Sequence, residues 1–327
     1  MNKKNSKKPI WLVMTGFSCN NNCVMCSTRP KAEFYPDRKT QEIIKDLAKG
    51  KKDGYSKVEF TGGEPTIRPD ILYLVKIAKD FGYKEVGIST NARMLSYREF
   101  CQKIIENGVN KITFTLNAHN SKLGDAICRT SGAFRQTVQG AKNILEYPEI
   151  TTSVNTVVSK LNYKYLQQIG DFISNLGIKC WHILDLIPDG YAKEFYKILA
   201  IKPSDLSKDI NNLDKTIEKF NLVIFFDFPL CLFSPKMLDN PKINFITAQG
   251  RTEVIKQTGY KPKRFERSAD DFYKDIHKRR IKICQNCRFC KSCGGIWKDN
   301  LDLYGEKEIE YLVEKHSCLN NNEANIS

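Results

Sequence analysis

The chain has 327 residues, of which 41% are hydrophobic, and it carries a formal net charge of +15 at pH 7. This length supports a large hydrophobic core with a smaller appendage, and no apolar run reaches the roughly 20 residues that a membrane-spanning helix needs. The lysine-rich segment 1–9 is not followed by the apolar core of an export signal, so the sequence predicts a cytoplasmic protein.

From residue 10 to about residue 186 the chain alternates between strand-like runs and helical stretches. Runs rich in β-branched or apolar residues predict strands at Ile10–Thr15, Lys57–Thr61, Glu85–Ser89, Lys111–Leu116, Thr151–Val158 and Lys179–Leu184. Helical periodicity predicts helices at Thr40–Lys49, Asp70–Phe81, Tyr97–Glu106, Ala133–Tyr147 and Tyr163–Leu176. This alternation indicates an α/β fold with parallel strands, either an open doubly wound sheet or an incomplete (β/α) barrel.

The alternation ends after residue 186. Asp205–Phe220 is predicted as a helix, Asn221–Phe228 as one more strand, and Glu306–Lys315 as a short amphipathic helix. The stretch 233–280 is loop-rich and basic. We therefore expect a basic extension at 1–9, a barrel at 10–220, a small cysteine-rich domain at 221–318 and a disordered polar tail at 319–327.

The sequence contains twelve cysteines, and most of them lie in two groups, within 19–26 and within 284–293. In a reducing compartment, clustered thiols bind metals or take part in redox chemistry more often than they form disulfides. Cys101, Cys128 and Cys180 are isolated in the sequence, and we interpret them as small buried hydrophobic residues.

The first group, Cys19, Cys23 and Cys26, forms a Cys-x3-Cys-x2-Cys motif directly after the first predicted strand. Three thiolates on one loop suit a [4Fe–4S] cluster that keeps one iron free of protein ligands. The alternative is structural zinc, which needs four ligands, and no neighbouring His or Cys completes this set. We therefore predict that these cysteines are both the metal ligands and the catalytic residues.

Together with four further segments, this motif resembles the signature of the radical SAM superfamily, whose members use S-adenosylmethionine (SAM). The resemblance covers roughly the first 185 residues. The other segments are Gly62-Gly63-Glu64, Ser89-Thr90-Asn91, Arg129 with Ser131-Gly132-Ala133-Phe134, and Asn155-Thr156-Val157-Val158. Cys19, Gly62, Ser89, Asn117 and Asn155 lie at or beside the C-terminal ends of predicted strands, where barrels and open α/β sheets build their sites.

The resemblance implies a partial (β/α)6 barrel, similar to a TIM barrel, with an open-iron [4Fe–4S] cluster and SAM as cofactors. It implies that SAM is bound by Gly62, Gly63, Glu64, Ser89, Asn91, Arg129 and Asn155. In this interpretation Glu64 pairs with the amino group of SAM and Arg129 with its carboxylate. Ile183 would fill the middle of the pattern that lies under the adenine in this family, although the Gly and Phe that flank it in the family are missing here.

The second group has the spacing Cys284-x2-Cys287-x5-Cys293, with Cys290 inside it. Taken alone, paired CxxC motifs occur at least as often in zinc ribbons as in iron sites. The spacing also resembles the SPASM and twitch domains of radical SAM enzymes, which bind auxiliary clusters and take a ligand from just after the barrel. The resemblance implies one auxiliary [4Fe–4S] cluster bound by Cys231, Cys284, Cys287 and Cys293, with Cys290 spare or in place of one of them.

The resemblance also implies a reaction, in which the reduced first cluster donates an electron to SAM and a 5′-deoxyadenosyl radical takes a hydrogen atom from a substrate. A one-electron reductase such as flavodoxin or ferredoxin would supply the electron. Asn117 and His119 follow the fourth predicted strand and are expected to face the substrate.

Four hypotheses about the function remain at this point, and one of them, a pure electron-transfer protein, is disfavoured because the Gly-Gly-Glu and Ser-Thr-Asn segments would have no role in it. We favour a ribosomally made peptide that is oxidatively modified or cross-linked. A phosphorylated small molecule or nucleotide is the alternative, because the net charge of +15 suits an anionic ligand. A zinc-ribbon nucleic-acid-binding protein is the third, and it is disfavoured because basic and aromatic residues are sparsely interleaved.

Overall fold

The computed structural model describes residues 10–247, 278–316 and 318. The predicted basic extension at 1–9 and tail at 319–327, and most of the predicted basic loop stretch, lie outside the described residues. Among the described helices, none is both long enough and apolar enough to cross a bilayer.

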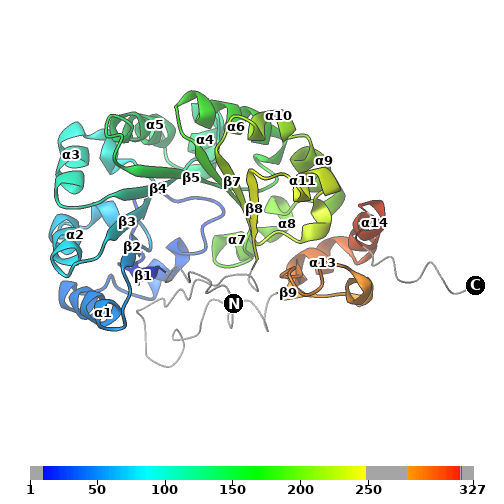
Figure 1. Cartoon of the computed structure of the whole chain (residues 1–327), viewed down its shortest axis with the longest axis horizontal. Coiled ribbons are helices and arrows are strands. Elements are labelled where there is room, and N and C mark those ends of the chain that lie inside the picture. The colour runs from blue at the N-terminus through cyan, green and yellow to red at the C-terminus, as the bar shows by residue number, and fades with distance from the viewer. Residues whose placement is uncertain (1–9, 248–277, 317, 319–327) are drawn as a thin grey trace, which may run out of the picture.

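The fold is built on eight parallel strands that pair in chain order, with β1 and β8 at the two edges of a curved sheet (Figure 1). The strands are β1 (Trp11–Met14), β2 (Lys57–Thr61), β3 (Glu85–Thr90), β4 (Lys111–Thr115), β5 (Thr151–Val157), β6 (Cys180–Leu184), β7 (Leu222–Phe226) and β8 (Ile243–Ile246). The predicted α/β fold with a partial barrel is confirmed. Sequence analysis missed β8, because its Ile-Asn-Phe-Ile run is short and lies in a stretch interpreted as loop.

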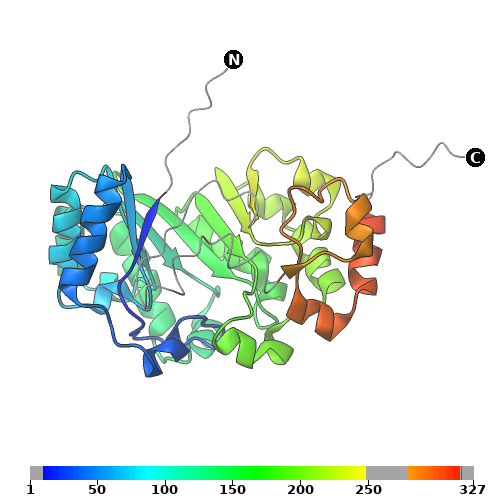
Figure 2. The same cartoon turned by 90° about the horizontal axis from the view of Figure 1, so that it is seen from below.

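Helices cover the convex face of the sheet (Figures 1 and 2). Those that were predicted are α1 (Thr40–Lys52), α2 (Ile71–Asp80), α3 (Arg98–Glu106), α5 (Ala133–Ile144), α6 (Leu166–Asn175) and α14 (Lys307–Lys315). The predicted helix Asp205–Phe220 is instead two helices, α9 (Pro203–Asn211) and α10 (Asp214–Ile217). The helices that were not predicted are short, namely α4 (Ser121–Cys128), α7 (Tyr191–Glu194), α8 (Tyr196–Leu199), α11 (Pro235–Leu238) and α13 (Lys298–Tyr304).

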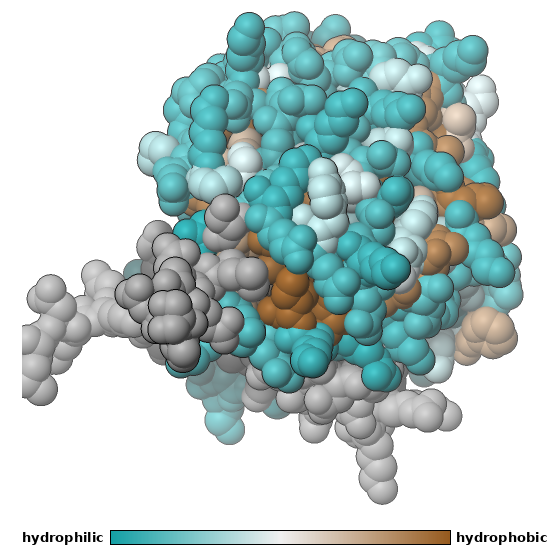
Figure 3. All heavy atoms as spheres, turned by 90° about the vertical axis from the view of Figure 1, so that its right-hand side faces the viewer, coloured by the Kyte–Doolittle hydropathy of each residue, from teal (hydrophilic) through white to brown (hydrophobic). Residues whose placement is uncertain are grey.

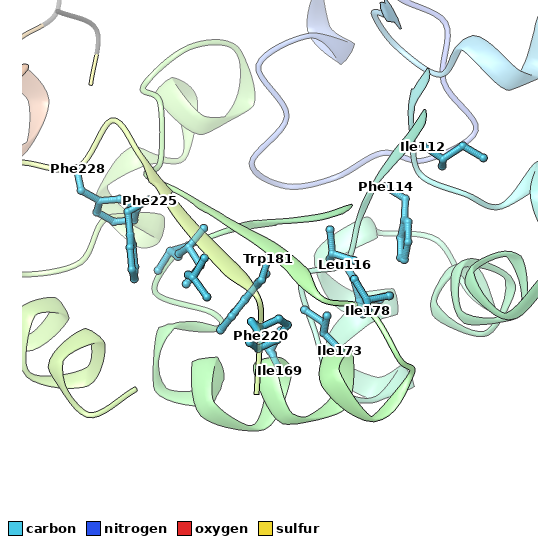
Figure 4. Close-up of a cluster of buried hydrophobic side chains, with 14 of the residues drawn as sticks. Ile112, Phe114, Leu116, Ile169, Ile173, Ile178, Trp181, Phe220, Phe225 and Phe228 are labelled. Carbon is cyan, nitrogen blue, oxygen red and sulfur yellow. The ribbon is translucent and has the colours of Figure 1, made fainter. Parts of the chain in front are cut away.

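The main core lies between the convex face of the sheet and these helices. Successive residues of a strand point to opposite faces, and Phe114, Trp181 and Phe225 point outward, where they are almost completely buried. Trp181 packs against Phe220, and Ile169 of α6 belongs to the same cluster (Figure 4). The outward residues of the strands therefore stabilise the fold, and the inward residues of the same strands can form a site.

The C-terminal region lies against the β8 end of the sheet (Figures 1 and 2). It contains β9 (Lys278–Arg279), a short 3-10 helix η6 (Lys282–Asn286), β10 (Ile296–Trp297), α13 and α14. Hydrogen bonds join it to the barrel, from Trp297 Nε1 to Asp185 Oδ2 at 2.7 Å and from the Tyr304 hydroxyl to the Ala200 carbonyl at 3.0 Å. The outer face on this side is mostly hydrophilic, with smaller hydrophobic areas (Figure 3).

The predicted division between a barrel at 10–220 and a second domain at 221–318 stays a prediction. The sheet itself continues past residue 220, because β7 and β8 pair in parallel with the strands before them.

Candidate functional site

The first cysteine group lies on a loop that follows β1 and is anchored to the end of α4. The backbone N–H groups of Asn22 and Val24 donate to the carbonyls of Cys128 and Ile127, each at 3.0 Å. The guanidinium of Arg129 donates to the Asn22 carbonyl at 2.6 Å. These bonds fix the loop from the side of the fourth strand, so that its thiols are held at the C-terminal edge of the sheet.

The Gly62-Gly63 pair anchors the same loop from the other side. The N–H of Gly63 donates to the Gly16 carbonyl and the N–H of Glu64 to the Ser18 carbonyl, both at 2.8 Å. A Cβ at Gly62 would lie 2.5 Å from the Gly16 oxygen, and one at Gly63 would lie 2.1 Å from the Ser18 oxygen. Both glycines are therefore required by the close approach of the cysteine loop, a reason that the sequence motif alone does not reveal.

A cavity of about 280 Å³ opens between these segments. Its lining includes nine of the predicted site residues, which come from the loop and the strand ends: Cys19, Cys23, Cys26, Gly62, Gly63, Glu64, Ser89, Asn91 and Asn155. Asn117, expected to face the substrate, lines it too. Residues far apart in the sequence thus form one concave site at the edge where parallel strands end.

Two of the three thiols accept hydrogen bonds from nearby backbone N–H groups. Cys19 Sγ accepts from the Asn21 N–H at 3.4 Å, and Cys26 Sγ accepts from the Arg29 N–H at 3.1 Å. Burial raises the pKa of Cys19 to about 12 and also raises the pKa of Cys26. Without a metal, these thiols therefore keep their protons. Metal binding must displace the protons, and the N–H donors then stabilise the thiolates that form.

Cys128 is a member of this site that sequence analysis missed. Its thiol shares a hydrogen bond with Cys23, which raises the pKa of Cys23 and lowers that of Cys128, and it lines the same cavity. The interpretation of Cys128 as an isolated hydrophobic residue is wrong for that reason. The missing signal was α4, an eight-residue helix whose C-terminus brings Cys128 back to the cysteine loop.

The Glu64 carboxylate is buried and holds two strand ends together. Its Oε1 accepts from the N–H and the hydroxyl of Thr66, at 3.0 and 2.5 Å, and from the Thr90 hydroxyl at 2.6 Å. Its Oε2 accepts from the Asn91 N–H at 2.6 Å. Burial raises the pKa of Glu64 and these donors oppose the increase. A carboxylate can accept about four hydrogen bonds. Donors of the protein itself therefore use most of the acceptor positions of Glu64.

Three other expected residues lie elsewhere. Arg129 is exposed, does not line the cavity, and stacks over the Tyr191 ring at 4.7 Å while it binds the cysteine loop. Ile183 is fully buried in the core, so it does not face the inner side of the sheet. His119 packs against the Tyr165 ring at 5.4 Å, also outside the cavity lining.

The second cysteine group gathers thiols from three separate segments. Cys231, in the 3-10 helix Leu230–Leu232 after β7, is buried and lies within electrostatic range of Cys284, Cys287 and Cys293, and burial raises its pKa. N–H groups of Phe289 and Gly295 donate to Cys287 and Cys293 Sγ, both at 3.4 Å. The four predicted ligands thus lie in the same region of the fold.

Cys318 joins this group, although no role was predicted for it. It is fully buried, its thiol shares a hydrogen bond with Cys287, and its carbonyl accepts from the Arg288 N–H at 2.8 Å. Within the described parts of the chain, no three His, Cys, Asp or Glu side chains converge as the ligands of a single ion do. The thiol positions alone therefore do not select a metal.

Comparison with protein families identifies a match to the Radical SAM superfamily over residues 13–173. Among curated proteins, the chain is similar to a probable GTP 3′,8-cyclase of Saccharolobus solfataricus, with 27% identity over 207 residues, 63% of each chain. It is also similar to an AdoMet-dependent heme synthase of Oleidesulfovibrio alaskensis, with 30% identity over 178 residues, 54% of this chain and 45% of that protein. The matches therefore span less than two thirds of these relatives.

Two solved structures share the fold over most of the chain. Streptococcus suis SuiB bound to the precursor peptide SuiA has a TM-score of 0.61 and 18% identity, covering 91% of this chain and 73% of SuiB. Native anSMEcpe with bound AdoMet has a TM-score of 0.64 and 12% identity, covering 94% of this chain and 96% of that one. At these identities the likeness establishes the fold.

Proposed function

Because the chain belongs to the radical SAM superfamily, we propose that it cleaves SAM reductively at the cavity next to Cys19, Cys23 and Cys26 and then abstracts a hydrogen atom from a substrate. The observation that carries this proposal is the shared lining: the three thiols and the Gly62–Glu64, Ser89–Asn91 and Asn155 positions border one cavity. When bound there, an open-iron [4Fe–4S] cluster would supply the electron that breaks the sulfonium bond.

The protein's own groups would bind and orient the two cofactors. Cys19, Cys23 and Cys26 would ligate three irons, and the N–H donors beside them stabilise thiolates. The amide and hydroxyl groups of the strand ends would bind the polar parts of SAM. Arg129 would act on the cysteine loop, and its predicted pairing with the SAM carboxylate would need the guanidinium to reach the cavity, which it does not line.

For the second group we propose one auxiliary [4Fe–4S] cluster held by Cys231, Cys284, Cys287 and Cys293. Support comes from the gathering of these thiols around Cys231, which lies within electrostatic range of the other three. Cys318 contacts Cys287 and is the rival for fourth ligand. A cluster at this place would supply a second one-electron centre close to the barrel.

We propose a ribosomally made peptide as the substrate, modified oxidatively in the cytoplasm with electrons from a one-electron reductase. The support is that SuiB carries the precursor peptide SuiA and anSMEcpe carries the Cp18Cys peptide in structures that share this fold over 91% and 94% of the chain. A nucleotide is the second candidate, supported by the 27% identity to a probable GTP 3′,8-cyclase. The zinc-ribbon hypothesis is set aside, since the superfamily match accounts for the first cysteine group.

The test uses the full chain, reconstituted anaerobically with iron and sulfide and reduced with dithionite. SAM is added with either the peptide fraction or the nucleotide pool from a strain that lacks the gene, and 5′-deoxyadenosine is measured by liquid chromatography. We expect the peptide fraction to raise its formation well above the substrate-free level. Stimulation by the nucleotide pool alone would select the second candidate, and no 5′-deoxyadenosine under any condition would refute the proposed function.

A further inference from the structure

His182 lies on the inner face of the sheet, beside the cavity. On β6 its neighbours Trp181 and Ile183 point outward and are fully buried in the core, so His182 points to the opposite face. Its partner across the β5–β6 pair is Asn155, which lines the cavity. Sequence analysis gave His182 no role, because neither a motif nor a neighbouring cysteine pair marks it.

A chain of three side chains runs along this face and ends at the cavity. His182 Nδ1 lies 2.9 Å from Asn155 Oδ1, and His182 Nε2 lies 3.4 Å from Cys180 Sγ. Burial and the positive charge of Lys111 lower the pKa of His182 to about 4, so the ring is neutral at pH 7 and has one N–H. Burial raises the pKa of Cys180, which therefore keeps its S–H.

These protonation states fix the direction of both hydrogen bonds. An imidazole nitrogen is a better acceptor than a thiol sulfur, so the Cys180 S–H donates to Nε2 and the ring proton is on Nδ1. The Nδ1–H then donates to Asn155 Oδ1. With its oxygen held by His182, the Asn155 carboxamide has only its NH2 group left to offer. Among the described residues, none accepts a hydrogen bond from that nitrogen, and it is available to a ligand in the cavity.

We propose that His182 is a positioning residue, which fixes the Asn155 carboxamide so that its NH2 group donates a hydrogen bond to an acceptor atom of bound SAM. This inference rests on the proposed function, because it takes SAM as the ligand of the cavity. Without the Nδ1–H donor, the carboxamide can rotate by half a turn and present its oxygen, which repels an acceptor. The hydrogen bond between Asn155 and SAM would therefore depend on His182, which does not itself contact SAM.

The test measures SAM affinity of the anaerobically reconstituted full chain by equilibrium dialysis. His182→Leu keeps most of the side-chain volume and removes the donor, and we expect it to bind SAM about tenfold more weakly, since one buried hydrogen bond is at stake. His182→Asn places an amide nitrogen near the position of Nδ1 and should keep most of the affinity. Asn244→Ala is the matched control. Asn244 is on β8, two strands away from His182 in the same row of paired residues, which runs through Ile224 of β7.

A double-mutant cycle separates positioning from a general structural role. In the Asn155→Ala background, His182→Leu should have no further effect on SAM affinity, and iron content should stay at the wild-type level in all variants. Wild-type affinity of His182→Leu, equal losses in His182→Asn and His182→Leu, or an additional loss in the Asn155→Ala background would each overturn the inference. If the wild-type protein binds iron but not SAM, the proposed function fails first and the inference with it.

Discussion

The two cysteine groups differ in how the chain assembles them. Cys19, Cys23 and Cys26 are on one loop, which backbone hydrogen bonds anchor to Gly63, Glu64 and the end of α4. The second group joins Cys231, the segment 284–293 and Cys318, which are distant in sequence and lie on short helices and turns. The first group therefore takes its three predicted ligands from one loop and has one further thiol, Cys128, beside them. The second group takes its predicted ligands from distant segments and has two further thiols, Cys290 and Cys318, beside them.

Removal of the first group should have the largest effect and should leave the second intact. With Cys19, Cys23 and Cys26 all replaced by Ala, we expect about half of the reconstituted iron and sulfide to be lost and about four irons per chain to remain. The reason is that the two groups share no ligand. Iron and sulfide analysis with the absorbance near 400 nm checks this. A variant that retains one zinc and no sulfide would refute the auxiliary cluster.

Single replacements in that triple variant should identify the fourth ligand of the second group. Cys231→Ala should lose most of the remaining iron, because Cys231 lies within electrostatic range of three ligands, whereas Cys318 contacts only Cys287 among those three. Cys290→Ala and Cys318→Ala are the matched controls and should keep about four irons. If Cys318→Ala loses the iron and Cys231→Ala keeps it, Cys318 is the fourth ligand, and the ligand set predicted from the sequence is wrong at that position.

Glu64→Gln should give a smaller effect, on both stability and SAM binding. An amide presents two N–H donors where Thr66, Thr90 and Asn91 already donate, so at least one of these donors loses its acceptor. We expect a loss of about 1–3 kcal/mol in unfolding free energy and SAM binding weakened by about one to two orders of magnitude. Thermal denaturation and dialysis measure the two. Unchanged SAM affinity with reduced stability would limit Glu64 to holding the strand ends.

The smallest effect concerns the contact between the barrel and the C-terminal region. Burial raises the pKa of Asp185 to about 6, although Lys278 and Trp297 oppose the increase. A folded-state pKa above the unfolded value of about 4 contributes stability that is complete below pH 4 and is lost as the pH rises through 6. Asp185→Asn removes this dependence, so its melting temperature relative to wild type should rise between pH 4 and pH 7. A constant difference across that range would contradict the assignment.

The fold and part of the candidate site could be predicted from the sequence, and the rest of the site could not. The parallel sheet and the segments that line the cavity could be predicted from periodicity and motifs, since short strands with regular spacing and Gly-Gly-Glu leave a local signature. Cys128, Cys318 and His182 were missed because their roles arise from packing: a helix returns Cys128 to Cys23, and strand register places His182 beside Asn155. The role expected for Arg129 depended on where its side chain points, which a motif does not specify.

One assay shows directly whether the Cys19–Cys26 loop and the cavity beside it cleave SAM. Wild type and Cys26→Ala are reconstituted anaerobically, reduced with dithionite and incubated with SAM, and 5′-deoxyadenosine is quantified by liquid chromatography. We predict that the wild type forms 5′-deoxyadenosine and that Cys26→Ala forms none, although it keeps the iron of the second group. Equal formation by both proteins, or a wild type that binds iron and never cleaves SAM, would contradict the account.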